Sequence, residues 1–121
     1  MLLKALVLLP LAAGTAALLT RSHGPRRLLL LGTALAHLGL VAACWVTAPG
    51  PAWGGTLALD AAGRLFLSIA SVLFAAAAAY AQSYLRQEDP GLRSDFQEGL
   101  AFANAPERVF TACLLFFLAA M

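Results

Sequence analysis

Long runs of apolar residues alternate with short polar segments along this chain. The run that organises the pattern extends from Leu57 to Leu85, where a short polar start leads into a charge-free stretch. A helix rises about 1.5 Å per residue, so such a stretch is long enough to cross a bilayer core of about 30 Å. The pattern therefore predicts a membrane-spanning helix over 63–85.

Three more helical runs are predicted, two before this span, over 2–20 and 28–48, and one after it, over 107–121, beyond a polar loop at 86–106. The expected fold class is all-α, a polytopic transmembrane helical protein with one membrane domain over 1–121. The last run reaches only about 22 Å and is still apolar at Met121. We therefore expect three spans plus a truncated fourth, in a fragment of a longer subunit.

The composition fits lipid as the surrounding medium. Hydrophobic residues make up 61% of the chain and charged residues 12%, and the mean hydropathy is +0.81. A soluble domain carries about 25% charged residues, and a soluble chain this short cannot bury so much apolar surface. The basic residues are scattered and the net charge is only +2, so the expected partner is the lipid bilayer and not nucleic acid.

The arginines predict an orientation. The loop 20–27 contains Arg21, Arg26 and Arg27, the loop 86–106 with its flank contains Arg86, Arg93 and Arg108, and the other side has Lys4 and Arg64. Since cytoplasmic loops are enriched in basic residues, we expect both loops in the cytoplasm and the N-terminus outside, in a bacterial-type inner (plasma) membrane. A secretory signal peptide is the alternative interpretation of the first run.

Prolines and glycines mark expected irregularities. Gly24 and Pro25 are expected to interrupt the helical conformation between the first two spans, and Pro10 is expected to kink the first span. The segment 49–56, PGPAWGGT, cannot continue a helix, and residues 56–59 alternate in a way that allows a short extended piece.

Aromatic side chains are expected at the two membrane–water interfaces. Trp45 and Trp53 lie near one end of the third span, and Tyr80 and Tyr84 lie near the other, with Arg86 just beyond. Amphipathic rings and a flanking cation are typical of an interfacial belt and anchor.

Small residues recur along one face of two spans and predict close helix–helix contact. Bulky side chains of the third span, by contrast, are expected to face lipid or neighbouring helices. The small residues are Gly32, Ala36, Gly39 and Ala43 in the second span and Ser71, Ala75, Ala79 and Ser83 in the third, and the bulky ones are Phe66, Leu67, Leu73 and Phe74.

Two polar residues are candidates for a role. His37 is the only ionisable residue inside the second span, and a histidine at that depth suits proton transfer near neutral pH. The alternative is a neutral imidazole that is hydrogen-bonded to a neighbouring helix. Asp60 is interpreted as a structural N-cap of the third span, accepting from the amide of Ala62 or Gly63 and able to pair with Arg64, in preference to an ion-path role.

The sequence contains no catalytic pattern. It has no nucleophile–base pair, no paired buried carboxylates and no glycine-rich phosphate loop. Cys44 and Cys113 lie in apolar runs without metal-ligand spacing and are interpreted as packing residues. We therefore predict no catalytic, cofactor-binding or metal-binding residue, and no cofactor, in this chain.

Several segments, taken in order, resemble a known family. They are the proline-containing first span with its arginine-rich turn, the opening Leu59–Phe66 of the third span, its exit Tyr80…Tyr84-Leu85-Arg86, and the run from Arg108 to Met121 that follows a charged loop. The pattern is similar to the N-terminal end of the antiporter-like proton-translocating membrane subunits. These occur in respiratory complex I (chain 5 type), in group 4 hydrogenases and formate hydrogenlyase, and in multisubunit cation/proton antiporters.

The resemblance covers nearly all of this chain but only about the first quarter of such a subunit. Arg64 departs from the family pattern, and the long charged loop favours the hydrogenase-type branch. The resemblance implies the N-terminal portion of a membrane subunit of a proton-translocating redox complex, such as NADH:quinone oxidoreductase or a membrane-bound hydrogenase, with other membrane subunits as partners. It supplies no proton-path residue here, because those of the family lie on later helices. The alternative is a self-contained small membrane protein, either an assembly factor or a small dimeric transporter.

Overall fold

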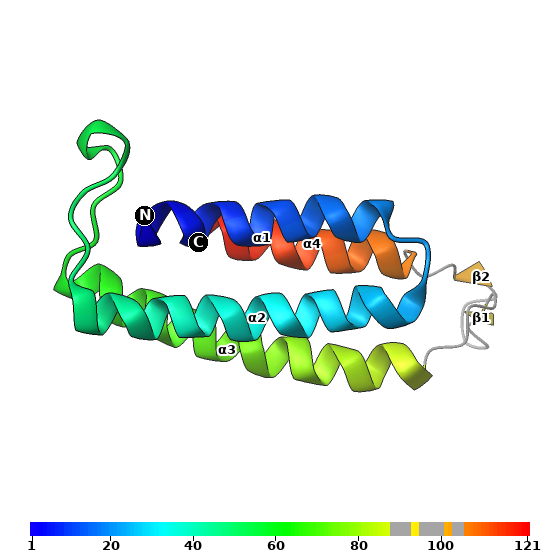
Figure 1. Ribbon diagram of the computed structural model, residues 1–121. Helices are drawn as coiled ribbons and strands as arrows, with labels where there is room; N and C mark the ends of the chain where they lie inside the picture. Colours follow the sequence, from blue (N-terminus) through cyan, green and yellow to red (C-terminus); the bar gives the residue numbers. More distant parts are fainter. Residues whose placement is uncertain (88–92, 95–100, 103–105) are drawn as a thin grey trace.

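Helices dominate the computed structural model of this chain, which describes residues 1–87, 93–94, 101–102 and 106–121. The helices are α1 (Leu2–Leu19), α2 (His23–Thr47), α3 (Ala61–Gln87) and α4 (Glu107–Ala120) (Figure 1). Three of them, α1, α2 and α3, are long and apolar enough to cross a membrane. The prediction of an all-α, polytopic transmembrane fold is confirmed.

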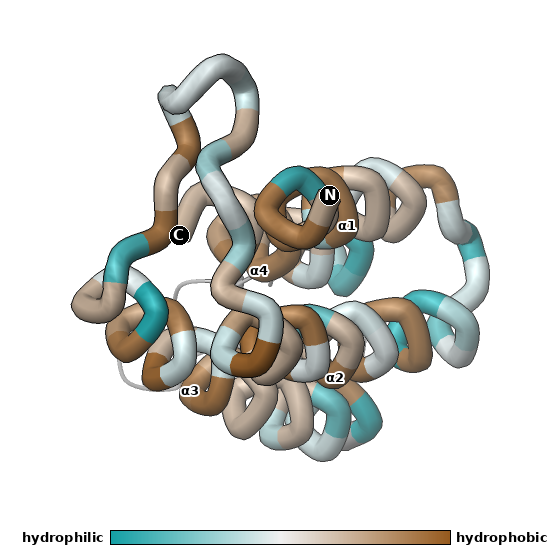
Figure 2. The backbone as a smooth tube through the Cα atoms, turned by 60° about the vertical axis from the view of Figure 1, so that its left-hand side comes forward, coloured by the Kyte–Doolittle hydropathy of each residue, from teal (hydrophilic) through white to brown (hydrophobic). Residues whose placement is uncertain are grey.

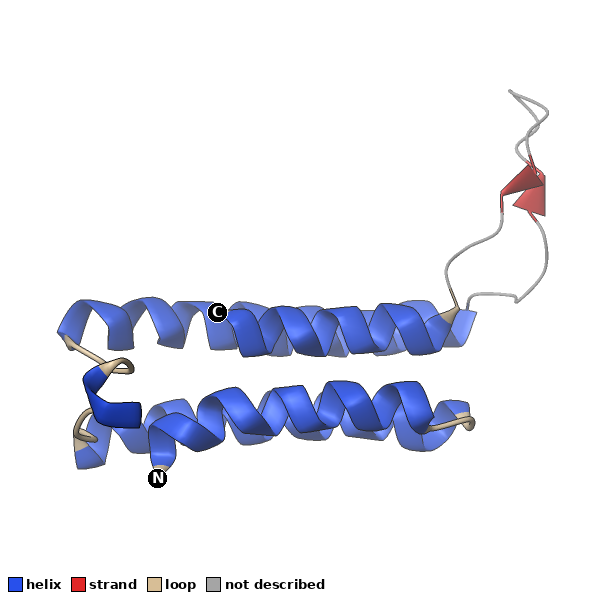
Figure 3. Cartoon of the chain, turned by 90° about the horizontal axis from the view of Figure 1, so that it is seen from above, coloured by secondary structure: helices blue, strands red, loops and turns tan. Residues whose placement is uncertain are grey.

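The helices alternate in direction and form two layers, α1 with α4 and α2 with α3 (Figure 1). α1 also packs along α2, whereas α3 and α4 touch each other at few places. α3 is the longest helix, with 27 residues, and extends well past the end of the 14-residue α4 (Figure 3).

The two ends of the bundle differ. The polar end consists of residues 20–27, 82–86 and 106–108, where α1 and α3 end and α2 and α4 begin. The loop end consists of the connection 48–60 and both chain termini (Figure 1). Hydrophilic residues gather in the α1–α2 turn and around the start of α3 (Figure 2).

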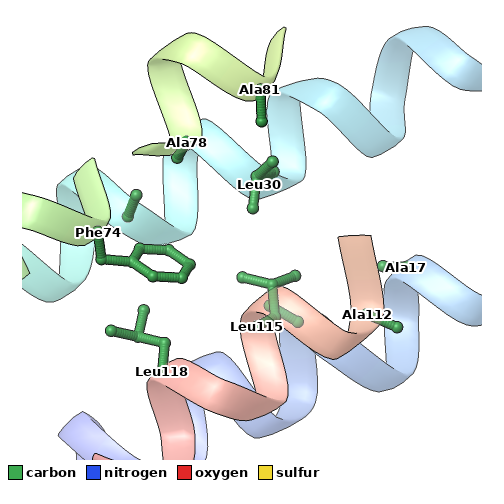
Figure 4. Close-up of a cluster of buried hydrophobic side chains, with 10 residues drawn as sticks. Ala17, Leu30, Phe74, Ala78, Ala81, Ala112, Leu115 and Leu118 are labelled. Atoms are coloured by element: carbon green, nitrogen blue, oxygen red, sulfur yellow. The ribbon is translucent and has the colours of Figure 1, made fainter. Parts of the chain in front are cut away.

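The core lies between the two layers (Figure 4). Leu30 of α2 and Leu115 of α4 are fully buried there, and Phe74 of α3 reaches toward Leu118 of α4. Phe74 therefore packs against neighbouring helices, while Phe66 and Leu73 are exposed. A second cluster, nearer the loop end, is formed by Leu3, Leu6, Val41 and Cys44.

The expected break at Gly24 and Pro25 is wrong in position. The turn occupies residues 20–22, and α2 already begins at His23, five residues before the predicted start of the span. A proline is tolerated in the first turn of a helix because the first amides have no intrahelical acceptor. α1 likewise continues through Pro10.

The small-residue stripe of α2 does not form a contact surface with the other described elements of this chain. Gly32, Ala36 and Gly39 are exposed, and a Cβ added at either glycine would meet no atom within 4 Å. α2 packs instead through the face that carries Leu30, Ala34, His37, Val41 and Cys44.

The small-residue stripe of α3 does not stay within the helix–helix interface along its whole length. Ser71 is buried, but Ala79 and Ser83 are exposed. A strict spacing of four residues drifts around a helix with 3.6 residues per turn, so the stripe cannot stay on one face. The buried positions mix spacings of three and four: Ser71, Phe74, Ala78, Ala81 and Leu85.

The connections contain little regular structure. A single bridge pairs Ala52 with Leu57 around the short turn Trp53–Gly55, in which Gly54 and Gly55 have positive φ. β1 (Arg93–Ser94) and β2 (Ala101–Phe102) form an antiparallel pair. The rest of the predicted polar loop 86–106, apart from Arg86, Gln87 and Pro106, lies outside the described residues.

Candidate functional site

His37 lies near the midpoint of α2 and points into the bundle, where only 2% of the residue is exposed. Its Nδ1 is 3.0 Å from the hydroxyl oxygen of Ser71 on α3, which is also buried. No hydrogen bond among the described residues links this pair to another titratable group. Among the described residues, the arrangement is therefore a two-residue polar contact between α2 and α3.

Asp60 stands directly before α3. Its Oδ1 accepts a hydrogen bond of 2.6 Å from the amide of Gly63, the geometry of a helix N-cap. A Cβ on Gly63 would lie 2.9 Å from that same Oδ1, so the glycine leaves the room that the cap requires. Arg64 donates to the carbonyl of Asp60, at 3.4 Å from its Nε.

Arg64 also connects α3 to the end of α2. Its guanidinium lies 5.3 Å from the ring centroid of Trp45, whose Nε1 donates to the hydroxyl of Ser68 at 2.8 Å. An indole ring with a cation on its face and its N–H satisfied is suited to the membrane–water interface. These contacts join the end of α2 to the first two turns of α3.

Arg27 is the centre of the polar end. Its Nε lies 3.0 Å from Oε1 of Glu107 at the start of α4, and its terminal nitrogen donates to the carbonyl of Leu85 at 2.6 Å. Gln82 of α3 donates to the carbonyl of Arg27 at 2.8 Å. One arginine thus joins α2, α3 and α4, although α3 and α4 barely touch.

Glu107 receives a second partner, because Nδ1 of His23 lies within hydrogen-bonding distance of its Oε2. Glu107 is the first residue of α4, outside the three spans, and its side chain is 10% exposed. Burial raises the pKa of this carboxyl, but the hydrogen bonds and charges of Arg27 and His23 outweigh it, so the pKa is lowered.

Among the described residues, two buried polar atoms at or near the polar end have no hydrogen-bond partner, Nε of Arg26 and Oγ1 of Thr111. Arg26 is 3% exposed, and its terminal nitrogen donates to the carbonyl of Thr20. The guanidinium therefore has one backbone partner and, within the described part of the chain, no acidic one.

The potential metal-ligating side chains of the described residues lie apart from one another. Among them, no group of three or more His, Cys, Asp or Glu side chains is placed to hold a metal ion. Both cysteines are free, with Cys44 buried on α2 and Cys113 exposed on α4.

The polar end was not foreseen from the sequence. Arg27 and Glu107 are separated by 80 positions, and the sequence pattern assigns Arg27 only to the arginine-rich loop that predicts the orientation. The signal that was present is a lone acidic residue at the start of an apolar helix, since an acid there needs a cation once its surroundings are desolvated.

Comparison with known proteins gives no family to which this chain belongs. No protein family, no curated protein and no solved structure matches it.

Proposed function

We propose that this chain is part of an antiporter-like membrane subunit in a redox-driven, proton-translocating complex of the hydrogenase or NADH:quinone oxidoreductase type. The observation that carries the proposal is the meeting of its family-like segments at Arg27. This residue belongs to the arginine-rich turn, and it binds Leu85 of the Tyr84-Leu85-Arg86 exit and Glu107, the neighbour of Arg108.

A second feature supports the proposal that this chain packs against other membrane subunits. Gly32, Ala36 and Gly39 form a small-residue face on α2 that no other described element of this chain covers. Small residues let a second membrane helix approach closely. In this role the chain contributes helix packing, and the protons cross elsewhere in the complex.

The test is purification from the native membrane. A tagged chain, expressed from its own locus and extracted in mild detergent, is expected to co-elute with iron–sulfur subunits. Bound iron, acid-labile sulfide and hydrogen- or NADH-dependent electron transfer in the same fraction are the readouts. A chain that elutes alone or as a homodimer contradicts the proposal and favours a self-contained small membrane protein.

A matched pair of variants sharpens this test. Gly39→Leu fills the exposed small-residue face and is expected to reduce recovery of the iron–sulfur subunits while the bundle keeps its thermal stability. Ala76→Leu adds comparable volume at an exposed position of α3 and is expected to leave recovery unchanged. Equal recovery of the iron–sulfur subunits with both variants would show that the small-residue face of α2 is not a subunit contact.

A further inference from the structure

The turn between α1 and α2 gathers positive charge that the described residues only partly offset. Arg21, Arg26 and Arg27 lie within or beside the first turn of α2, which contains no acidic residue and has no side-chain cap from Ser22. The amino end of a helix carries a partial positive charge and favours a nearby anion. Of the three arginines, only Arg27 has an acidic partner in the described structure.

The buried charge of Arg26 destabilises the folded protein. It is 3% exposed, its Nε has no acceptor, and a carbonyl is its only partner among the described residues. A charge removed from water destabilises a protein unless a counter-charge and hydrogen bonds compensate. Arg21 is exposed and takes part in none of the hydrogen bonds or ion pairs of the described residues.

The described residues leave part of the first turn of α2 uncovered. Gly24 is exposed, and a Cβ added there would meet no atom within 4 Å. Leu19, which ends α1, is 83% exposed, and Leu28, in the second turn of α2, is 72% exposed. Arginines without an acidic partner among the described residues thus lie beside exposed leucines, at the end of two helices long and apolar enough to cross a membrane.

We propose that the α1–α2 turn binds the phosphate of an anionic phospholipid. Arg21 contacts the phosphate, the buried Arg26 adds positive charge from inside the bundle, and the acyl chains lie along Leu19 and Leu28. A lipid fits better than a soluble anion because the cations stand beside apolar surface at the level of the headgroups. An anionic lipid fits better than a zwitterionic one because it brings no cation of its own to a site that already has an excess.

The test uses the purified chain in neutral detergent and native mass spectrometry. Phosphatidylglycerol and phosphatidylcholine with the same acyl chains are offered in equal amounts, and phosphatidylglycerol is expected to be retained preferentially. Arg21→Gln is expected to weaken retention about fivefold, the effect of one interfacial arginine. Because Arg21 has no partner in the described structure, this variant is expected to keep the wild-type melting temperature.

The control is Arg64→Gln, which removes a cation at the loop end and is expected to leave phosphatidylglycerol retention unchanged. Equal retention of the two lipids, or an equal loss in both variants, overturns the proposal. So does displacement of the lipid by inorganic phosphate beyond the effect of chloride at the same ionic strength, because that result assigns the site to a soluble anion.

The acidic segment after α3 is the remaining competitor with the lipid phosphate for the arginines of the α1–α2 turn. Its carboxylates are changed together to amides in one variant, at Glu88, Asp89, Asp95 and Glu98. An unchanged preference for phosphatidylglycerol supports the lipid site. A preference that appears only in this variant shows that the carboxylates of the chain itself occupy the turn, and it overturns the proposal.

Discussion

The ring of Phe116 on α4 occupies the space beside Gly14 of α1 that a side chain would need. A Cβ built on Gly14 would lie 2.6 Å from Cε1 and 2.7 Å from Cδ1 of that ring. No real Cβ approaches a carbon so closely, so the glycine is what allows α1 and α4 to pack as tightly as they do. Since α4 touches α3 only sparsely and packs mainly along α1, this contact belongs to the interface that holds α4 in the bundle.

Gly14→Leu is therefore expected to lower the free energy of unfolding by about 1–3 kcal/mol, the usual cost of overpacking. The measurement is thermal or SDS-induced unfolding in detergent. Gly39→Leu is the control, because a Cβ at that position would meet no described atom within 4 Å apart from the nearby backbone of α2 itself, and it is expected to change stability little. Equal losses in the two variants would show that the Phe116 contact is not the cause.

His37 and Ser71 are expected to be coupled energetically. In a double-mutant cycle with His37→Leu and Ser71→Ala, the interaction energy should be about 0.6 kcal/mol and at most about 1.7 kcal/mol, the range of hydrogen bonds between membrane helices. Thr33→Val, at a buried position of α2, is expected to show no coupling to Ser71→Ala. If the losses of unfolding free energy from His37→Leu and Ser71→Ala are additive, the hydrogen bond between the two residues does not contribute to stability.

Acid is expected to weaken the polar end. The pKa of Glu107 is lower in the folded protein than in the unfolded chain, so its stabilising contribution is complete above the ordinary glutamate pKa and is lost as the pH falls through the lowered value. The melting temperature should therefore fall on acidification into that range. Glu107→Gln should lower it at neutral pH and flatten this part of the pH profile, and a variant that keeps the full wild-type slope would contradict the assignment.

Ala48→Gly is expected to stabilise the protein. Ala48 ends α2 with φ 41° and ψ 67°, a left-handed conformation that costs an L-residue with a Cβ about 1–2 kcal/mol but costs glycine little. The expected gain in unfolding free energy is about 1 kcal/mol. Ala43→Gly, in the body of the same helix, should instead lose about 0.5–1 kcal/mol, and a loss at both positions would contradict the strain at Ala48.

The orientation predicted from the arginines is testable with single cysteines in a background that lacks Cys44 and Cys113. Ser22 and Gly54 are both exposed, at opposite ends of the bundle. An impermeant maleimide applied to intact cells should label a cysteine at Gly54 and reach one at Ser22 only after permeabilisation. The reverse pattern would invert the topology.

Local chemistry in this sequence predicts local structure well. Apolar run length gives the three spans, and an aspartate three residues before a glycine fits the cap that is found at Asp60 and Gly63. Helix faces are harder to predict, because in lipid an apolar or small residue is tolerated on either side. The exposed Gly39 and the buried Phe74 show that size alone does not select the packed face of a membrane helix.

The long-range polar contacts could not be predicted from this sequence. Nothing near Arg27 indicates that its partner is Glu107 rather than one of the other acids, and the choice follows from the way α1 brings α4 alongside α2. The close fit of Phe116 on Gly14 has the same origin, because a glycine in an apolar run gives no sign of what fills the space beside it.

Both tryptophans of the chain, Trp45 and Trp53, belong to the loop end, one at the close of α2 and the other in the connection to α3. The intrinsic indole fluorescence of this protein therefore originates at a single face of the membrane. In proteoliposomes, iodide added outside will quench only those molecules whose loop end faces outward, and the quenched fraction is a direct optical count of insertion direction that needs no label.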